Sequence, residues 1–267
     1  MNQAILGKGT RLLSVVVAAL LLMPPGFPQG RGGPQAGPPP SAKDAAPMDL
    51  TGYWVSIVTE DWRYRMVTPA KGDYASLPLN PAGRKVADTW DPGKDEASGN
   101  QCRSYGAAAI MRVPGRLHIT WEDDRTLKIE TDAGTQTRLL HFGGAQPPAG
   151  EPTWQGLSAA LWDVPPAGRG MGGGTAVRPG QPRAGTLKVV TTHMRPGYLR
   201  KNGVPYSANA VMTEYFDRTN EPNGDSWLVV TTIINDPQYL QQEFITSTHF
   251  KKQADAAGWA PSPCEAK

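Results

Sequence analysis

The sequence predicts an all-β fold, an antiparallel barrel of about 8–10 strands with one short helix. Two observations predict it. Short segments rich in β-branched and aromatic residues recur along the chain, separated by turns of Gly, Pro, Asn and Asp. Several of these segments alternate apolar with polar residues, as strands buried on one face do. Closure into a barrel removes exposed sheet edges, and eight or more strands can enclose one small ligand.

Nine segments are expected to form the strands of this barrel. In residues 116–123, Leu117, Ile119 and Trp121 alternate with polar side chains. The DWRYRM segment, residues 61–66, also alternates, which is typical of a strand at the barrel rim or of a solvated edge. The nine expected strands are residues 51–58, 116–123, 126–131, 135–142, 156–163, 186–194, 209–218, 226–236 and 244–252.

One helix is expected over residues 80–93. Asn80 can accept hydrogen bonds from the first free N–H groups of the helix, and Pro81 suits the first helical position. The Asp-Pro-Gly sequence of residues 91–93 should end the helix, because proline disfavours helical backbone in the residue before it.

Residues 1–29 are predicted to be a signal peptide. Lys8 and Arg11 precede an uncharged apolar run, residues 12–23. This run is shorter than the about 20 apolar residues that a membrane-spanning helix needs. An uncleaved anchor is the alternative, because no clear small-residue cleavage pattern follows the run.

The rest of the chain is predicted to be a tether and one domain. Residues 30–48 are dominated by proline and glycine and cannot bury enough surface to order themselves, so we expect a disordered tether. Residues 49–267 are expected to form a single β-barrel domain. Within it, the Gly/Pro-rich residues 165–185 are expected to form a flexible insert, since no lysine and helix follow as in a phosphate-binding loop.

The charge of the chain argues against a nucleic-acid partner. It has 27 Lys and Arg against 24 Asp and Glu, a formal net charge of +3. A nucleic-acid-binding domain usually carries a basic stripe and a high isoelectric point. We therefore expect no nucleic-acid partner.

The two cysteines predict a disulfide and an oxidising compartment. Cys102 and Cys264 are the only cysteines of the chain. Disulfides persist in the compartments that exported proteins enter, so we expect a Cys102–Cys264 bond, with two buried free thiols as the alternative. With the predicted signal peptide, this indicates a periplasmic or secreted protein that has no transmembrane span once the signal is removed.

Several motifs resemble an uncharacterised family of exported bacterial proteins. Members of that family begin with D-L-[ST]-G-x-W and have a lipocalin-like, calycin-type barrel. The resemblance implies this fold and export, and it implies no activity and no site residue. It extends over about residues 49–252, and the motifs that carry it are DLTGYW at 49–54, PTWQGLSAALWD at 152–163, NGVPYSANAVMTEYFDR at 202–218, WLVVTTIINDPQYL at 227–240 and FITSTHFKK at 244–252.

The sequence predicts no metal and no cofactor. Imidazole is the commonest metal ligand, but no two of the four histidines are two or four residues apart. The chain lacks the G-x-S-x-G and H-E-x-x-H motifs, and no G-x-G-x-x-G motif directly follows a predicted strand.

Glu214 is the candidate catalytic residue. It shares a strand face with Met212 and Phe216. If this face is interior, burial raises the pKa of the carboxyl, and Glu214 could act as a general acid or base with His193 as its partner. The alternatives are a structural ion pair with Arg138 and a Glu214 that faces solvent.

The segment RPGYLRKNGVPYSANA, residues 195–210, is the candidate ligand-binding segment. It joins two predicted strands, and it forms either a flap over one barrel end, with Tyr198 and Tyr206 as the lid, or a plain connection. Aromatic walls with a few polar groups are typical of small-molecule pockets, so Trp154 and Arg138 complete the candidate ligand-binding set.

Three functions fit this sequence. The first is an exported barrel that binds a small, partly apolar ligand. The second is a cofactor-free lyase or isomerase that uses an interior Glu214 with a histidine or tyrosine. The third is an envelope interaction protein without a pocket, which a barrel filled by its own side chains would favour.

Overall fold

The computed structural model describes residues 39–144, 150–165 and 185–266. The predicted signal peptide, residues 1–29, and residues 166–184 of the predicted insert lie outside the described residues. The longest described helix has seven residues, so no helix in these ranges is long enough to cross a bilayer.

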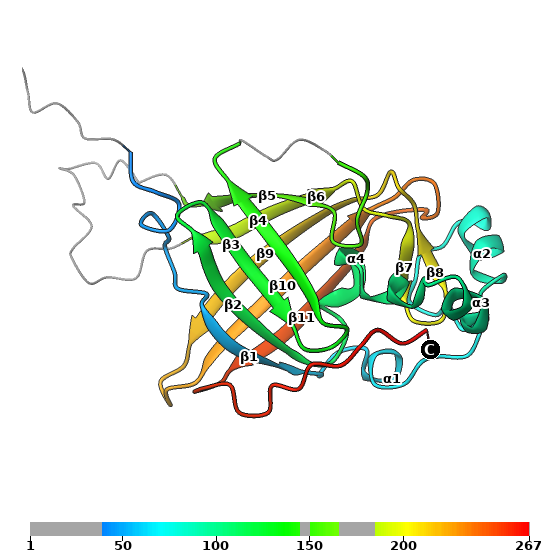
Figure 1. The fold of residues 1–267 in the computed structure, drawn as a ribbon, viewed down its shortest axis with the longest axis horizontal. Coiled ribbons are helices and arrows are strands. Elements are labelled where there is room, and N and C mark those ends of the chain that lie inside the picture. Colours follow the sequence, from blue (N-terminus) through cyan, green and yellow to red (C-terminus); the bar gives the residue numbers. More distant parts are fainter. Residues whose placement is uncertain (1–38, 145–149, 166–184, 267) are drawn as a thin grey trace, which may run out of the picture. The chain divides into compact units, whose positions relative to one another are not determined.

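Nine strands close into a barrel (Figure 1), which confirms the predicted fold class. Around the barrel they follow the order β1-β11-β10-β9-β6-β5-β4-β3-β2. The strands are β1 (Gly52–Ile57), β2 (Arg116–Asp123), β3 (Thr126–Thr131), β4 (Gln136–Phe142), β5 (Leu157–Asp163), β6 (Thr186–Thr192), β9 (Val211–Asn220), β10 (Ser226–Asn235) and β11 (Phe244–Lys252).

One strand pair differs from the predicted antiparallel pattern. β4 and β5 run parallel, with Leu140 opposite Ser158, while the other neighbours in the barrel are antiparallel. Parallel strands need a connection longer than a hairpin turn, and residues 143–156 provide that length.

The barrel interior is filled by alternate residues of its own strands. Leu117 and Ile119 on β2 and Leu228 and Val230 on β10 are buried in one continuous apolar core. A fully buried aliphatic side chain of this kind contributes about 1.5–3 kcal/mol of hydrophobic free energy. The apolar residues that alternate along the predicted strands are therefore the residues that form this core.

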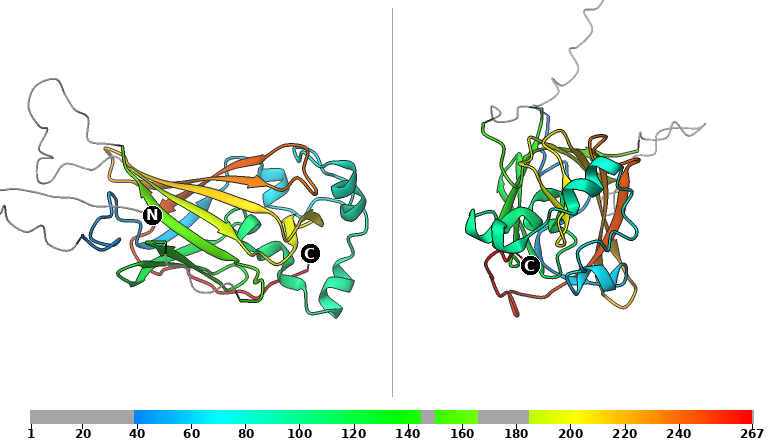
Figure 2. Two further views of the ribbon diagram at one scale, coloured as in Figure 1. Left: turned by 90° about the horizontal axis from the view of Figure 1, so that it is seen from above. Right: turned by 90° about the vertical axis from the view of Figure 1, so that its right-hand side faces the viewer.

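A second apolar core closes one end of the barrel (Figure 2). A hairpin of β7 (Gly197–Arg200) and β8 (Val204–Tyr206) lies at this end with the short helices. Leu199 and Val204 of the hairpin pack in the same cluster as Met212 and Ile234 of the barrel strands. The helices are α1 (Trp62–Arg65), α2 (Pro81–Ala87), α3 (Pro92–Ala97), the 3-10 helix η1 (Gln101–Tyr105) and α4 (Ala107–Ile110).

The predicted helix is present but is shorter than expected. Asn80 caps α2 by accepting a hydrogen bond from the Gly83 N–H, as its position predicts. The helix ends at Ala87. A second helix, α3, then begins at Pro92, where the Asp91 side chain caps the new N-terminus. An Asp-Pro pair can start a helix as well as end one, so the prediction of one short helix missed α3.

The prediction of a strand over residues 61–66 is wrong. Trp62–Arg65 form the helix α1, which follows a left-handed Asp61 at φ 48°. The alternating side chains do not line two faces of a sheet. Arg65 is instead buried, with its Nε donating to the Arg112 carbonyl oxygen at 2.9 Å. Tertiary hydrogen bonds therefore outweigh the local pattern here.

Part of the predicted tether packs on the barrel. The Trp162 indole donates a hydrogen bond to the Ala42 carbonyl oxygen at 2.8 Å, and the Lys43 N–H donates to the Asp124 carbonyl oxygen at 3.2 Å. Met48 packs against the barrel core. The ordered part of the chain therefore begins before Asp49, although proline and glycine dominate the residues that precede it.

The Cys102–Cys264 disulfide is present, as predicted, with the two Cα atoms 5.0 Å apart. It joins the C-terminal segment to η1, the 3-10 helix at the closed end of the barrel. Ser262, two residues before Cys264, donates its N–H to the Asp132 carbonyl oxygen beside the β3–β4 turn. The disulfide thereby holds η1 and the C-terminal segment on the barrel.

Candidate functional site

The predicted flap, residues 195–210, forms the hairpin β7–β8 at the closed end of the barrel. Residues 197–200 and 204–206 are buried. The Asn202 amide ties the turn down by donating to the carbonyl oxygens of Ala70 and Asp73, at 3.0 and 2.9 Å. The segment is therefore a fixed part of the structure and not a loose lid.

A groove of about 480 Å³ lies along this hairpin, between it and the helices α2 and α3. We call it the hairpin groove. Its volume is in the range of small-molecule sites. Six of its thirteen lining residues are aromatic or proline, and four are charged. The lining residues that carry the argument are Trp90, Asp95, Arg103, Tyr198, Tyr206 and Tyr239.

A hydrogen-bonded triad holds one wall of the hairpin groove. The Tyr198 hydroxyl donates to Asp95 Oδ2 at 2.7 Å. Arg103 Nη1 donates to Asp95 Oδ1 at 2.6 Å and to the Tyr198 hydroxyl at 3.0 Å. Burial, and then the hydrogen bond to Asp95, raise the pKa of Tyr198 to about 12, which keeps its hydroxyl protonated at neutral pH. The triad fixes three polar groups at the edge of an aromatic surface.

Tyr206 lines the same groove, and its hydroxyl has no hydrogen-bond partner among the described residues. Its side chain is buried, and two glycines allow the close approach. A Cβ at Gly106 would lie 2.4 Å from the hydroxyl oxygen, and one at Gly197 would lie 2.7 Å away. A buried hydroxyl without a partner costs about 1–3 kcal/mol, and this one, packed against the two glycines, has almost no surface exposed to the groove.

Trp90 and Tyr239 contribute apolar surface to the hairpin groove from outside the hairpin. Trp90 packs directly against the hairpin turn. Gly203 has φ 82°, and a Cβ added there would lie 2.2 Å from the Trp90 Cβ. Only glycine fits a position that combines this backbone angle with this contact. The hairpin turn therefore also sets the distance between Trp90 and the hairpin.

Glu214 lies inside the barrel, and the second of the three predicted alternatives holds. It forms a bidentate ion pair with Arg138, in which Arg138 Nη1 donates to Glu214 Oε1 at 3.1 Å and both side chains are fully buried. Along β9 it stands between Met212 of the end core and Phe216 of the barrel core. Neither Glu214 nor Arg138 lines the hairpin groove. The pair supports the interior of the barrel, away from the hairpin groove.

Two further candidates do not lie where the sequence suggested. His193 is exposed and has a left-handed backbone, φ 54°, just after β6 ends, so it is not an interior partner of Glu214. Trp154 is half-buried and stacks under the Arg195 guanidinium at 4.4 Å, outside the hairpin groove. The alternation of β6 would place His193 on the interior face with Thr191. Because its φ is positive and the strand has ended, its side chain faces solvent instead.

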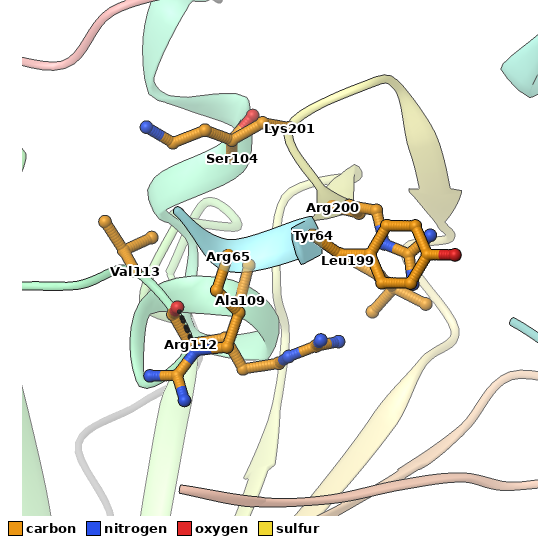
Figure 3. Close-up of a pocket in the computed structure, with 9 residues that line it drawn as sticks. All are labelled: Tyr64, Arg65, Ser104, Ala109, Arg112, Val113, Leu199, Arg200 and Lys201. Atoms are coloured by element: carbon orange, nitrogen blue, oxygen red, sulfur yellow. Dashed lines mark hydrogen bonds between the residues drawn. The ribbon is translucent and has the colours of Figure 1, made fainter. Parts of the chain in front are cut away.

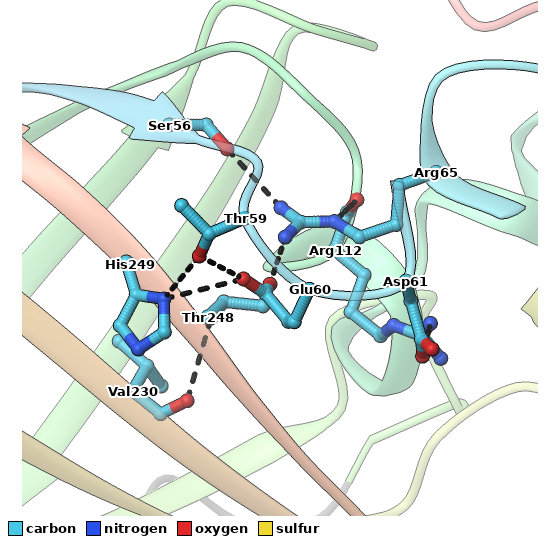
Figure 4. Close-up of polar contacts among 9 residues, drawn as sticks. All are labelled: Ser56, Thr59, Glu60, Asp61, Arg65, Arg112, Val230, Thr248 and His249. Carbon is cyan, nitrogen blue, oxygen red and sulfur yellow. Dashed lines mark hydrogen bonds and ion pairs between the residues drawn. The ribbon is translucent and has the colours of Figure 1, made fainter. Parts of the chain in front are cut away.

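His249 belongs to a surface network at the end of β1 (Figure 4). Its Nδ1 lies 3.1 Å from the Thr59 hydroxyl and 3.2 Å from Glu60 Oε2. Both contacts use the same ring nitrogen, so the three groups do not form the relay of a catalytic triad, which needs both nitrogens. Glu60 also pairs with Arg65, so the network anchors α1 to the barrel.

Asp95 and Arg103, like Trp90 and Tyr239, are residues of the hairpin groove that the sequence did not indicate as site residues. Asp95 lies in a helix that was not predicted, and its partner Tyr198 is 103 positions away. The only local sign was that Arg103 follows Cys102, whose disulfide fixes η1.

In residues 39–144, 150–165 and 185–266, no three His, Cys, Asp or Glu side chains are arranged to hold a metal ion. Comparisons with protein-family models, with curated proteins and with solved structures gave no match to this chain.

Proposed function

We propose that this chain is an exported β-barrel protein that binds a small, partly apolar ligand in the hairpin groove. The observation that carries the proposal is the groove itself, which combines about 480 Å³ of space with aromatic walls and a fixed Tyr198–Asp95–Arg103 triad. Mostly apolar pockets with a few oriented polar groups are the usual form of a small-molecule site.

The groups that line the hairpin groove define the kind of ligand. Trp90 and Tyr239 would contact its apolar part. The partly exposed guanidinium of Arg103 and the exposed ammonium of Lys94 could bind its polar part. A ligand with one hydrogen-bond acceptor beside an aromatic or aliphatic body meets both requirements.

The barrel interior is occupied by apolar side chains and by the Arg138–Glu214 pair, so it supports no interior site. A barrel filled in this way is what the third function predicts, and the hairpin groove outside the barrel is the observation that favours ligand binding instead. Export is part of the proposal. The apolar run of residues 12–23 and the Cys102–Cys264 disulfide support a periplasmic or secreted location, as does the resemblance to exported barrel proteins.

Native mass spectrometry of the exported protein tests this function. We expect a retained small molecule in the wild-type protein that is lost from Tyr239→Ala, which removes one aromatic wall. Tyr215→Ala is the matched control, because Tyr215 lies on the barrel wall beside Lys188, outside the hairpin groove. Equal loss from both variants, or equal retention by both, would count against the hairpin groove as the site.

A further inference from the structure

Three buried arginines surround a second, smaller pocket at the same barrel end (Figure 3). Arg65, Arg112 and Arg200 are 6%, 9% and 4% exposed. The space is about 30 Å³ and is also lined by Tyr64, Ser104 and Lys201, with the apolar Ala109, Val113 and Leu199. We call it the arginine pocket. It shares no lining residue with the hairpin groove.

Two of the arginines have carboxylate partners. Arg65 pairs with Glu60 and donates from Nη2 to the Ser56 hydroxyl at 3.1 Å. Arg112 Nη2 donates to Asp61 Oδ2 at 2.8 Å. The Arg112 Nη1 group remains without a partner among the described residues.

Arg200 is different, because it forms no ion pair within the described part of the chain. Its Nη2 donates to the Ala75 carbonyl oxygen at 3.0 Å, and its guanidinium stacks on the Tyr64 ring at 4.2 Å. Its Nε and Nη1 are buried and have no hydrogen-bond partner there. Figure 3 shows the Arg112 guanidinium directed toward the Tyr64 ring, behind which Arg200 lies.

The charges around the arginine pocket do not balance. Lys201 adds a fourth cation to the three arginines, while Glu60 and Asp61 are the two carboxylates paired with them. Asp61 and, more weakly, Asp73 act on Arg200 through space, but their own ion pairs are with Arg112 and with the exposed Arg63. A buried charge that lacks a counter-charge is costly, and an anion bound beside Arg200 and Arg112 would offset that cost.

The electrostatics of Arg112 agree with this imbalance. Burial lowers the pKa of its guanidinium, Asp61 opposes the shift, and the positive charges of Arg200 and Arg65 lower it further. The arginines therefore repel one another across the pocket.

Two residues of β7, Tyr198 and Arg200, line two different pockets. Residues two apart on a regular strand share a face, but the β7–β8 register shifts between Tyr198 and Arg200. Such a bulge re-aims a side chain. Tyr198 therefore lines the hairpin groove, and Arg200 lines the arginine pocket.

We propose that the arginine pocket binds the carboxylate group of a small organic acid. The planar guanidinium groups of Arg112 and Arg200 offer unpaired N–H donors of the kind that match the two oxygens of a carboxylate. A space of about 30 Å³ suits this flat, two-oxygen group better than a tetrahedral phosphate. Leu199 and Val113 contribute apolar side chains to the same lining.

Isothermal titration calorimetry at constant ionic strength tests the proposal, with sodium acetate, acetamide and inorganic phosphate as probes. We expect acetate to bind the wild-type protein, acetamide not to bind, and phosphate to bind more weakly than acetate. Arg200→Gln should weaken acetate binding by about tenfold or more, since a hydrogen bond to a charged group is lost. Arg125→Gln, an exposed arginine of the β2–β3 turn outside the pocket, is the control and should leave the affinity unchanged.

Arg200→Lys is the second variant, for the case that Arg200→Gln does not fold. It keeps the charge but loses the planar fork, so it should fold and still weaken acetate binding. Equal affinity for acetate in Arg200→Lys and the wild type would overturn the proposal. So would equal binding of acetate and acetamide, tighter binding of phosphate than of acetate, or the absence of any acetate binding by the wild-type protein.

Discussion

The Tyr198 hydroxyl donates a 2.7 Å hydrogen bond to Asp95 Oδ2, and this bond joins the hairpin β7–β8 to α3 across 103 positions of sequence. Arg103 contacts both partners, so one side of the hairpin groove is held by a closed set of three hydrogen bonds. From the sequence alone, Tyr198 is either part of the lid of a flap or part of a plain connection. The structure makes it a buried member of this triad, so its removal affects folding as well as binding.

Tyr198→Phe should lower the free energy of unfolding by about 1–3 kcal/mol. The substitution removes the hydroxyl and leaves Asp95 with Arg103 alone. Urea denaturation followed by circular dichroism measures the change. Tyr215→Phe on the barrel wall is the control and should change the free energy by less than about 0.5 kcal/mol. A Tyr198→Phe protein as stable as the control would show that the triad contributes nothing.

Tyr198 and Tyr74 should ionise near pH 12. Burial raises the pKa of each to about 12, followed by hydrogen bonding to Asp95 for Tyr198 and to Asp88 for Tyr74. An ordinary tyrosine ionises near pH 10, so the folded state holds these protons when the unfolded state has lost them. The stabilising contribution is full below about pH 10 and is lost as the pH rises toward 12.

Absorbance at 295 nm measures this titration. We expect a late phase near pH 12 that shrinks in Tyr198→Phe and in Tyr74→Phe. A titration that is complete by pH 11 while circular dichroism still reports a folded barrel would contradict the buried placement of both rings.

The Arg138–Glu214 pair should behave as a structural pair. Glu214→Gln or Arg138→Met alone leaves one buried charge without a partner, which costs about 3–5 kcal/mol. Replacing both residues by apolar ones of similar size should recover most of that loss. Chemical denaturation of the two single variants and the double variant measures the coupling. A double variant whose loss equals the sum of the single losses would argue against a paired charge.

Breaking the disulfide should cost stability without opening the barrel. Cys102→Ser with Cys264→Ser should lower the free energy of unfolding by about 2–5 kcal/mol. The C-terminal segment also keeps hydrogen bonds to the β3–β4 turn through Ser262. Hydrogen exchange should therefore become faster in η1 and the C-terminal segment and stay slow in β9 and β10. Uniform loss of protection would show that the disulfide is needed for the whole fold.

The strands and one cap could be predicted because their causes are local. Ile119 and Leu228 occupy alternate positions of short apolar runs, and Asn80 stands directly before a proline at a helix start. The inward position of Glu214 also follows from alternation, since its neighbours Met212 and Phe216 face the core. These features depend on residues within a few positions of one another.

The site could not be predicted from the same signals. Asp95 and Arg103 meet Tyr198 only after the barrel closes and brings η1, α3 and the hairpin together. Arg65 looked like one side of an alternating strand, but its hydrogen bond to Arg112 47 positions away turns the segment into a helix. Pairs so distant in sequence leave no periodic pattern.

Selective blocking of the hairpin groove tests the central claim most directly. The described residues contain no free cysteine, and the only two cysteines of the chain form the disulfide. A cysteine introduced by Lys94→Cys at the groove edge can therefore be labelled specifically with a bulky maleimide. The neutral fluorescent probe N-phenyl-1-naphthylamine reports an apolar site without favouring the arginine pocket. We expect the wild-type protein to bind it, labelled Lys94→Cys to lose that binding, and labelled Lys188→Cys on the barrel wall to keep it. Unchanged probe binding after labelling at position 94, or no probe binding by the wild-type protein, would contradict a ligand site in the hairpin groove.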